Sequence, residues 1–182
     1  MNTYLEFEKP IEQLDNKVHE LKSLNDNAPS DNLLEEITQV EEQINETYRK
    51  IYSSISPWQR TLVARHPQRP KTREYIQNLI EDFFPLSGDR FFSEDKAILG
   101  GFGKFRGKTV LVLGHEKGHD TTSRIEHNFG MPRPEGYRKA QRLMKLAEDF
   151  DIPVISFVDT PGAYPGVGAE QRGQSEAIAK TT

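Results

Sequence analysis

The sequence contains no cysteine, so neither a disulfide framework nor a thiolate metal site can form. It also lacks a basic excess, because 24 Lys and Arg residues stand against 28 Asp and Glu and the net charge is −4. A nucleic-acid-binding domain normally carries a basic surplus, so nucleic acid is not an expected partner. No apolar run approaches the roughly 20 residues of a membrane span, and residues 1–10 lack the layout of a signal peptide. We therefore expect a soluble, cytoplasmic protein with no membrane partner.

Residues 1–56 predict a helical hairpin, because apolar side chains recur at spacings of three and four residues in two segments. Those positions are Ile11, Leu14, Val18 and Leu21 in the first segment, and Ile37, Val40, Ile44, Thr47 and Ile51 in the second. Residues 25–31 form the predicted loop, with Asp31 or Asn32 as the cap of the second helix. The hairpin either packs on the rest of the chain or serves as a subunit-docking arm, and the pattern favours neither.

Residues 57–182 predict an α/β domain. After the proline-rich stretch 57–70, we expect a short helix over residues 72–84. Two β-prone runs, 97–105 and 109–113, indicate a hairpin turning at residues 106–108.

The second half of that domain alternates helix, strand, loop and helix. Residues 135–150 predict a helix whose apolar face carries Tyr137, Ala140, Met144 and Ala147. Residues 152–158 predict a buried strand, followed by a loop over 159–166 and a further helix from about Ala169. A parallel sheet needs several strands and two covered faces, so with one hairpin and one further strand the domain is predicted to be unfinished.

One motif matches a metal site by spacing alone. Residues 115–119 read His-Glu-Lys-Gly-His, the H-E-x-x-H signature of zinc proteases. That chemistry needs both histidines on one helical face, whereas here the motif directly follows the strand-like residues 110–114 and contains Gly118. The residues Thr121, Thr122 and Ser123 make a helical continuation doubtful. We interpret the motif as a polar loop after a strand and predict no metal site.

The glycine-rich loop after the predicted strand is the first candidate binding element. Gly162, Gly166 and Gly168 fit neither the P-loop nor the dinucleotide-binding pattern. A strand-to-helix turn of this kind brings bare backbone close to a ligand, and its amides can bind an anion or a developing oxyanion. A tight turn stabilised by Pro161 and Pro165 is the structural alternative.

Three cations near the start of the helix 135–150 form a second candidate: Arg133, Arg138 and Lys139. The helix dipole disfavours positive charge at that end, so another demand is expected to place them there. A phosphate of coenzyme A is one possible demand, and solvated surface charge is the alternative.

Several stretches of the chain, in order, resemble one family: the carboxyltransferase α subunit of the bacterial or plastid-type acetyl-CoA carboxylase, in its N-terminal portion. The stretches are residues 5–10, 64–70, 88–90, 128–132, 134–140, 159–170 and 172–179. Two departures stand out. The family often has Arg where this chain has His119, and it continues into a further strand and a second glycine loop, an oxyanion hole expected beyond Thr182.

The resemblance implies a crotonase-like (ClpP/crotonase) β-β-α fold, incomplete here, that follows the hairpin, with residues 57–182 as part of the carboxyltransferase domain. It implies an α2β2 assembly with a β subunit. It also implies transfer of a carboxyl group from carboxybiotin, held on biotin carboxyl carrier protein, to acetyl-CoA. The product is malonyl-CoA, in the first committed step of fatty acid synthesis. ATP would be used only by the partner biotin carboxylase, and no cofactor would be bound covalently by this chain.

The resemblance also distributes roles over the two candidate elements. Gly162, Tyr164 and Gly166 are expected on the biotin side of the active site, and the three cations near the coenzyme A phosphates. Because the oxyanion loop is expected beyond Thr182, we expect the 182-residue chain alone to be inactive. Two alternatives remain: a non-catalytic subunit-docking fragment, and another crotonase-type enzyme acting on an acyl-CoA.

Overall fold

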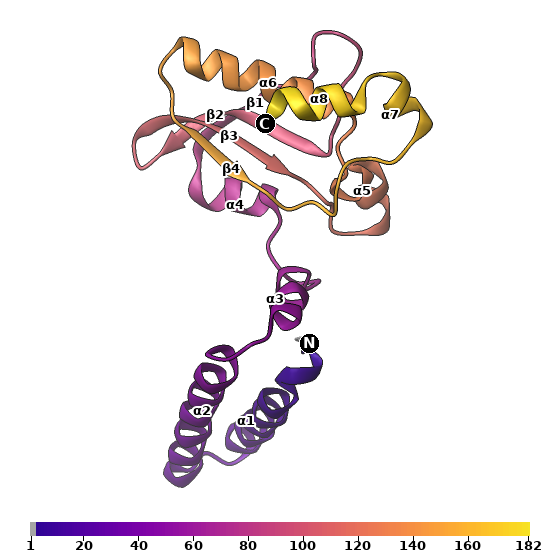
Figure 1. The fold of residues 1–182 in the computed structure, drawn as a ribbon. Coiled ribbons are helices and arrows are strands. Elements are labelled where there is room, and N and C mark those ends of the chain that lie inside the picture. The colour runs from indigo at the N-terminus through magenta and orange to yellow at the C-terminus, as the bar shows by residue number, and fades with distance from the viewer. Residues whose placement is uncertain (1–2) are drawn as a thin grey trace. The chain divides into compact units, whose positions relative to one another are not determined.

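A computed structural model describes residues 3–182 (Figure 1). The chain forms two compact units that divide between Arg69 and Pro70. The helix after the predicted hairpin, α3 (Pro57–Ala64), lies in the first unit. The predicted division at residue 56 into hairpin and carboxyltransferase domain stays a prediction.

The first unit is built on the predicted helical hairpin. After the short helix η1 (Glu6–Glu8), α1 (Lys9–Asn27) and α2 (Asp31–Tyr52) pack against each other. Their apolar positions meet in one core, as the spacing predicts: Val18, Leu21, Ile37 and Val40, flanked by Leu14, Leu33 and Ile44. The predicted cap is wrong by one residue, because Ser30 is the extended residue before α2 and Asp31 already lies in the helix.

The second unit contains a four-stranded sheet in the order β1-β2-β3-β4. The strands are β1 (Glu81–Pro85), β2 (Ile98–Phe105), β3 (Lys108–His115) and β4 (Val154–Phe157). The first two pairs are antiparallel, and β3 and β4 are parallel. The predicted hairpin is confirmed, and Arg106 and Gly107 turn it with φ of 49° and 76°.

Helices cover both faces of this sheet (Figure 1). Helix α6 (Pro134–Asp149), with α8 (Gln174–Thr181) packed against it, covers one face, and α4 (Thr72–Leu79) covers the other. The unit also contains α5 (Thr121–Glu126), η2 (Asn128–Gly130) and α7 (Val167–Gln171). Because side chains alternate along a strand, Leu111 and Leu113 of β3 pack with Leu143 of α6. Val110 and Val112 point to the opposite face, where α4 packs. The result is the predicted α/β architecture.

Two predicted elements differ from the structure. The helix predicted over residues 72–84 ends at Leu79, and Glu81–Pro85 form β1 instead. Asp82 adopts φ of 51°, which a helix cannot continue through, and the stretch gains hydrogen bonds from β2. The strand predicted as buried is half-exposed, because β4 lies at the edge of the sheet and Val154 is 45% exposed.

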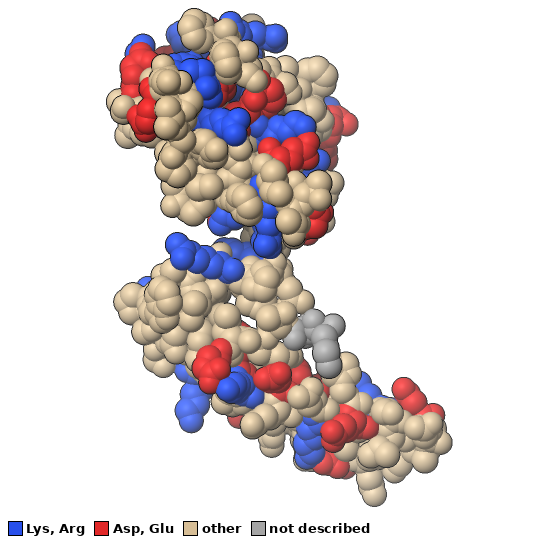
Figure 2. Space-filling model, turned by 90° about the vertical axis from the view of Figure 1, so that its right-hand side faces the viewer, with Lys and Arg blue, Asp and Glu red and all other residues tan. Residues whose placement is uncertain are grey.

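Within residues 3–182, no helix is both long and apolar enough to cross a bilayer. Acidic and basic side chains are interspersed over the face shown in Figure 2. The face in view therefore presents no extended surface of one sign, in line with the near balance of 24 basic and 28 acidic residues.

Candidate functional site

The candidate site is the loop that joins β4 to α7, which includes the predicted glycine loop. Because β3 and β4 are parallel, this loop lies at their carboxyl ends, the edge where open α/β sheets bind ligands. Two contacts tie it to the segment before α6. Thr160 Oγ1 donates to the carbonyl of Gly130 at 2.6 Å, and the Tyr164 amide donates to the carbonyl of Pro132 at 3.0 Å. The loop is thus held along residues 130–132.

Gln174, the first residue of α8, also links the loop to the segment before α6. Its Nε2 donates to the carbonyls of Pro132 at 2.9 Å and Tyr164 at 3.3 Å. The side chain is buried, and its Oε1 has no hydrogen-bond partner among the described residues. Sequence reasoning gave Gln174 no role, because a polar residue at a helix start is typical of surface. Its place in one of the stretches that carry the resemblance was the available signal.

Lys117, from the loop after β3, contacts the start of the glycine loop and Gly130. Its ammonium forms an ion pair with Asp159, and its side chain passes Gly130 so closely that a Cβ there would lie 2.6 Å from Lys117 Cγ. The Asp159 amide also donates to His115 Nδ1 at 3.4 Å. The polar loop after β3 therefore serves as a platform for the loop after β4.

The two glycines of the predicted biotin side differ in their surroundings. Gly162 has φ of 146°, which favours glycine, and a Cβ there would meet nothing within 4 Å. Gly166 is extended, with φ of −109°, and a Cβ there would lie 2.3 Å from the ring of Tyr164. Tyr164 therefore covers Gly166, whereas the backbone at Gly162 stays open. The amide of Gly162 already donates to Thr160 Oγ1 at 3.0 Å, so it is not available to bind an oxyanion. What the backbone at Gly162 provides is an open surface against which a ligand can pack.

Lys139 is a buried residue of α6. Its side chain is only 2% exposed, and its ammonium donates to the Glu94 carboxylate and to the carbonyls of Asp95 and Ile98. A lysine ammonium has three donors, and all three are used. The coenzyme A contact of Lys139 stays a prediction, but within this chain the ammonium is buried and already bonded.

Arg138 and Arg133 occupy different surroundings. The guanidinium of Arg138 donates to the carbonyl of Arg172 and lies 5.3 Å from the ring centroid of Phe91. Its buried Nη1 has no hydrogen-bond partner in the described part of the chain. The guanidinium of Arg133 lies 4.6 Å from the ring centroid of Tyr164. Within residues 3–182 no acceptor binds the Arg133 guanidinium. Of the three predicted cations, Arg133 alone keeps its donors free, and it lies beside the glycine loop.

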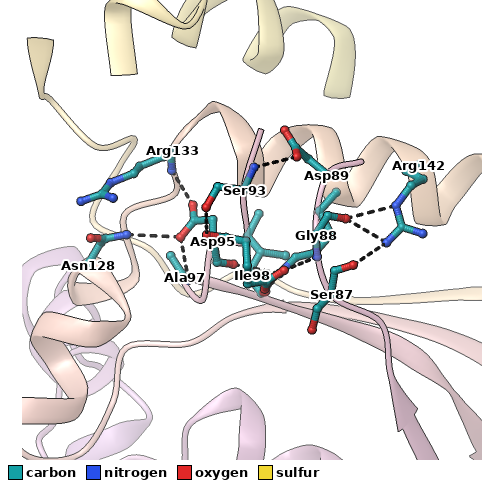
Figure 3. A network of polar contacts seen from close by, with 12 residues as sticks. Ser87, Gly88, Asp89, Ser93, Asp95, Ala97, Ile98, Asn128, Arg133 and Arg142 are labelled. Carbon is teal, nitrogen blue, oxygen red and sulfur yellow. Dashed lines mark hydrogen bonds and ion pairs between the residues drawn. The ribbon is translucent and has the colours of Figure 1, made fainter. Parts of the chain in front are cut away.

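Asp95 is the hub of the polar network that starts α6 (Figure 3). It is 3% exposed and accepts from the amides of Ala97 at 3.0 Å and Arg133 at 2.6 Å, and from Asn128 Nδ2 at 3.2 Å. Burial raises the pKa of Asp95 above its ordinary value, although these amides and nearby cations oppose the shift. A Cβ on Gly136 would lie 2.6 Å from Asp95 Oδ2, so this glycine admits the carboxylate. Of the three cations at this helix start, Lys139 is accounted for by its bonds to the Glu94 carboxylate and to the carbonyls of Asp95 and Ile98.

The loop before β2 is rigid and projects two aromatic rings. Asp89 Oδ1 accepts from the amides of residues 91, 92 and 93, and Arg142 donates to the carbonyls of Ser87 and Gly88 (Figure 3). Burial opposes ionisation of Asp89, but its hydrogen bonds prevail and its pKa is lowered. Phe91 and Phe92 are consequently held outward.

The H-E-x-x-H residues do not share a helical face. His115 ends β3, and the buried Glu116 accepts from the amides of Gly118 at 2.9 Å and Arg73 at 3.0 Å. Gly118 has φ of 73°, so the backbone turns within the motif. The predicted polar loop is confirmed, although α5 begins at Thr121, where a helix was doubted. Across residues 3–182 no group of three or more metal-ligating side chains occurs.

Comparison with known proteins identifies the family. The family described as "Acetyl co-enzyme A carboxylase carboxyltransferase-like" matches residues 4–182. The chain belongs to this family. Among relatives named acetyl-coenzyme A carboxylase carboxyl transferase subunit alpha, the protein of Paramagnetospirillum magneticum is 56% identical over 177 residues, covering 97% of this chain and 56% of its own length. That of Rhodopseudomonas palustris strain BisA53 is 57% identical over all 182 residues, again 56% of its length.

This member of the carboxyltransferase family thus spans a little over half the length of its curated relatives. Its fold resembles part of a solved single-chain, multi-domain long-chain acyl-CoA carboxylase. The TM-score is 0.50 and the identity 23%, covering 65% of this chain and 12% of that one. The predicted crotonase-like α/β class is confirmed.

Proposed function

We propose that this chain contributes to the carboxyltransferase of a bacterial acetyl-CoA carboxylase, acting in the cytoplasm with a β subunit in an α2β2 assembly. The reaction transfers a carboxyl group from carboxybiotin on the carrier protein to acetyl-CoA and yields malonyl-CoA. Biotin carboxylase, the only component that uses ATP, regenerates the carboxybiotin. The observation that carries this proposal is the family match over residues 4–182 at more than half identity to α subunits.

The loop between β4 and α7 is the proposed biotin-side wall. Its geometry suits a flat ring, because the backbone at Gly162 has open space where any other residue would place a Cβ. The Tyr164 ring lies over Gly166 and fills the space next to this open backbone. Thr160, Gln174 and Lys117 hold the loop in place, which keeps the wall rigid before a substrate arrives.

Arg133 supplies the proposed positive charge of this wall. Its planar guanidinium is oriented by the Tyr164 ring and keeps its donors free among the described residues. Arginine donors suit a carboxylate or phosphate group because they form two parallel hydrogen bonds. Arg133 lies beside the loop that we propose as the biotin-side wall. We therefore assign its guanidinium to the carboxylate of carboxybiotin rather than to a phosphate of coenzyme A.

A direct assay tests the proposal. An α chain extended to the length of its relatives, assembled with the β subunit, is expected to form malonyl-CoA from acetyl-CoA and a carboxybiotin donor. Arg133→Gln in that assembly is expected to raise KM for the donor and to leave KM for acetyl-CoA unchanged. Absence of malonyl-CoA formation by the assembled wild-type enzyme contradicts the function. A rise in KM for acetyl-CoA alone contradicts the assignment of Arg133.

A further inference from the structure

The first unit contains a cavity of about 230 Å³ that the proposed reaction does not use. It lies where the start of the chain, the end of α2 and the segment after α3 meet. Its lining residues are Thr3, Tyr4, Leu5, Glu8, Tyr48, Tyr52, Val63, His66 and Gln68. Pockets for drug-sized ligands measure roughly 300–1,000 Å³, so this cavity suits a single side chain better than a whole cofactor. We call it the tyrosine pocket.

Among the described residues that line the tyrosine pocket, Glu8 is the only acidic one, and it is buried. It is 7% exposed, and its two oxygens accept one hydrogen bond each, from the Tyr52 hydroxyl and from the Leu5 amide at 2.7 Å. A carboxylate offers about four acceptor positions, so both oxygens keep capacity. No cation pairs with Glu8 in the described part of the chain, since the neighbouring Lys9 pairs with Glu6. The N-terminus of α1 stabilises the charge but does not fill the cavity.

His66 adds no positive charge to the tyrosine pocket. Its Nε2 lies 2.7 Å from the carbonyl of Thr3, to which it must donate, and its Nδ1 accepts from the Gln68 amide at 3.2 Å. One ring nitrogen donates and the other accepts, which is the neutral imidazole. No Lys or Arg occurs among the described residues that line the cavity. The lining therefore carries a net negative charge.

The aromatic rings of the tyrosine pocket strengthen that negative character. Tyr48 and Tyr52 lie 5.9 Å apart between ring centroids, and the Tyr4 hydroxyl donates to Asp15. Burial raises the pKa of Tyr48, and the charges of Asp15 and Glu8 raise it further, so both carboxylates act on the cavity. The faces of aromatic rings attract cations, and a guanidinium also stacks on them. Rings and a carboxylate together form a cage for an organic cation.

We propose that the tyrosine pocket receives the guanidinium group of an arginine side chain from a partner protein. The guanidinium plane stacks against a tyrosine ring while its N–H edge donates to Glu8. Arginine suits this arrangement better than lysine, because its fork of donors matches a carboxylate and its flat group matches a ring. The assignment is independent of the carboxyltransferase reaction, whose proposed residues all lie in the second unit.

Binding of blocked amino acids to the 182-residue chain tests this proposal, with tyrosine side-chain NMR signals as the readout. N-acetyl-arginine amide is expected to shift the signals of Tyr48 and Tyr52 and to bind more tightly than N-acetyl-lysine amide. N-acetyl-citrulline amide, its uncharged analogue, is expected not to bind. Glu8→Gln, which keeps the size of the side chain, is expected to weaken arginine binding at least tenfold. Glu35→Gln, at an exposed position of α2 outside the cavity, is the matched control.

Three results overturn the binding of a guanidinium group in this pocket. They are equal binding of the citrulline and arginine amides, unchanged arginine binding in Glu8→Gln, and no shift of the tyrosine signals up to the solubility limit of the arginine amide. Agmatine, which carries the guanidinium without a peptide backbone, separates the possible sources. Tighter binding of agmatine than of the arginine amide assigns the pocket to a free metabolite and contradicts a partner protein. Thermal melting confirms that Glu8→Gln is folded before it is titrated.

Discussion

The guanidinium carbon of Arg133 lies 4.6 Å from the ring centroid of Tyr164. This contact joins a residue from the start of α6 to one from the glycine loop, two elements that the sequence assigned to different substrates. Because Arg133 has no other side-chain partner in residues 3–182, the ring fixes the plane of the guanidinium and leaves its edge free. Arg133 and Tyr164 form one surface, so substituting either residue is expected to remove the function of both.

Removing the ring is therefore expected to resemble removing the charge. In the assembled enzyme, Tyr164→Leu and Arg133→Gln are each expected to raise KM for the carboxybiotin donor by about tenfold, the effect of losing one charge-assisted hydrogen bond. The double variant is expected to lose little more than either single one, because the residues act as a unit. Arg124→Gln, an exposed arginine of α5, is the control. Additive losses in the double variant would show two independent roles.

Gly166 is expected to act through Tyr164. A Val side chain at position 166 has to displace the Tyr164 ring, since even a Cβ would lie 2.3 Å from it. We expect Gly166→Val to lower kcat on the order of tenfold to a hundredfold, as a misplaced wall group does, while assembly with the β subunit persists. Backbone strain is not the cause, because φ is −109°.

Gly168→Ala provides the matched control for that variant. Its Cβ would lie 3.2 Å from Arg172 Nη1, whereas Nε and Nη2 are the nitrogens that bond Glu135, so a shift of a few tenths of an ångström is enough to accommodate it. Steady-state kinetics and size-exclusion chromatography measure turnover and assembly. A folded, assembled Gly166→Val enzyme with unchanged kcat and KM for the donor would show that the loop is only structural.

Lys139 is expected to affect stability rather than coenzyme A binding. Lys139→Met leaves the Glu94 carboxylate and the buried carbonyls of Asp95 and Ile98 without their donor, and a buried acceptor left unsatisfied costs about 1–3 kcal/mol of unfolding free energy. Urea unfolding measures the loss. Lys145→Met, whose side chain is 66% exposed, is expected to change little. An unchanged unfolding midpoint in Lys139→Met, together with weaker binding of acetyl-CoA, would instead support a contact between Lys139 and a phosphate of coenzyme A.

The pH dependence of stability is expected to report on His115. Burial lowers the pKa of His115, so as the pH falls the unfolded chain binds a proton at this position before the folded chain does. Its contribution is therefore complete above about pH 6.5, the ordinary value for histidine, and decreases below it. His115→Gln is expected to flatten the dependence, measured as urea midpoints across this range. His119→Gln, at a half-exposed side chain, is expected to keep it.

The 182-residue chain by itself is expected to form no malonyl-CoA. It spans 56% of the length of the α subunits that it matches, and the partner subunit is absent from such an assay. A radiochemical assay with acetyl-CoA and a carboxybiotin donor measures this, with the assembled full-length enzyme as the positive control. Malonyl-CoA formation by the purified chain would contradict the assignment of the oxyanion loop to residues beyond Thr182.

The sequence predicts best the elements whose signals are local. α6 and the β2–β3 hairpin follow from the spacing of apolar residues and from a two-residue turn. β1 was missed because Phe83 and Phe84 extend the apolar pattern of α4, and only pairing with β2 makes the segment a strand. The exposure of β4 depends on its place in the sheet, which composition does not determine.

The site shows the same division. The glycine loop was located from its residues, and its strand-to-helix setting is as predicted. The roles of Lys139 and Gln174 were not accessible, because their partners come from distant positions: Glu94 lies 45 residues from Lys139, and Pro132 lies 42 residues from Gln174. A charge at a helix start resembles a ligand contact until its partners within the chain are known.

The sheet order has a consequence for folding kinetics. β2 and β3 close over two residues, whereas β4 can pair with β3 only after the whole of residues 116–153 has been gathered into a loop. Closing that longer loop costs more chain entropy, and helix α6 inside it offsets the cost by shortening the flexible span. We therefore expect the glycine loop that follows β4 to acquire its shape late, after the hairpin and α6 have formed the surface on which it rests.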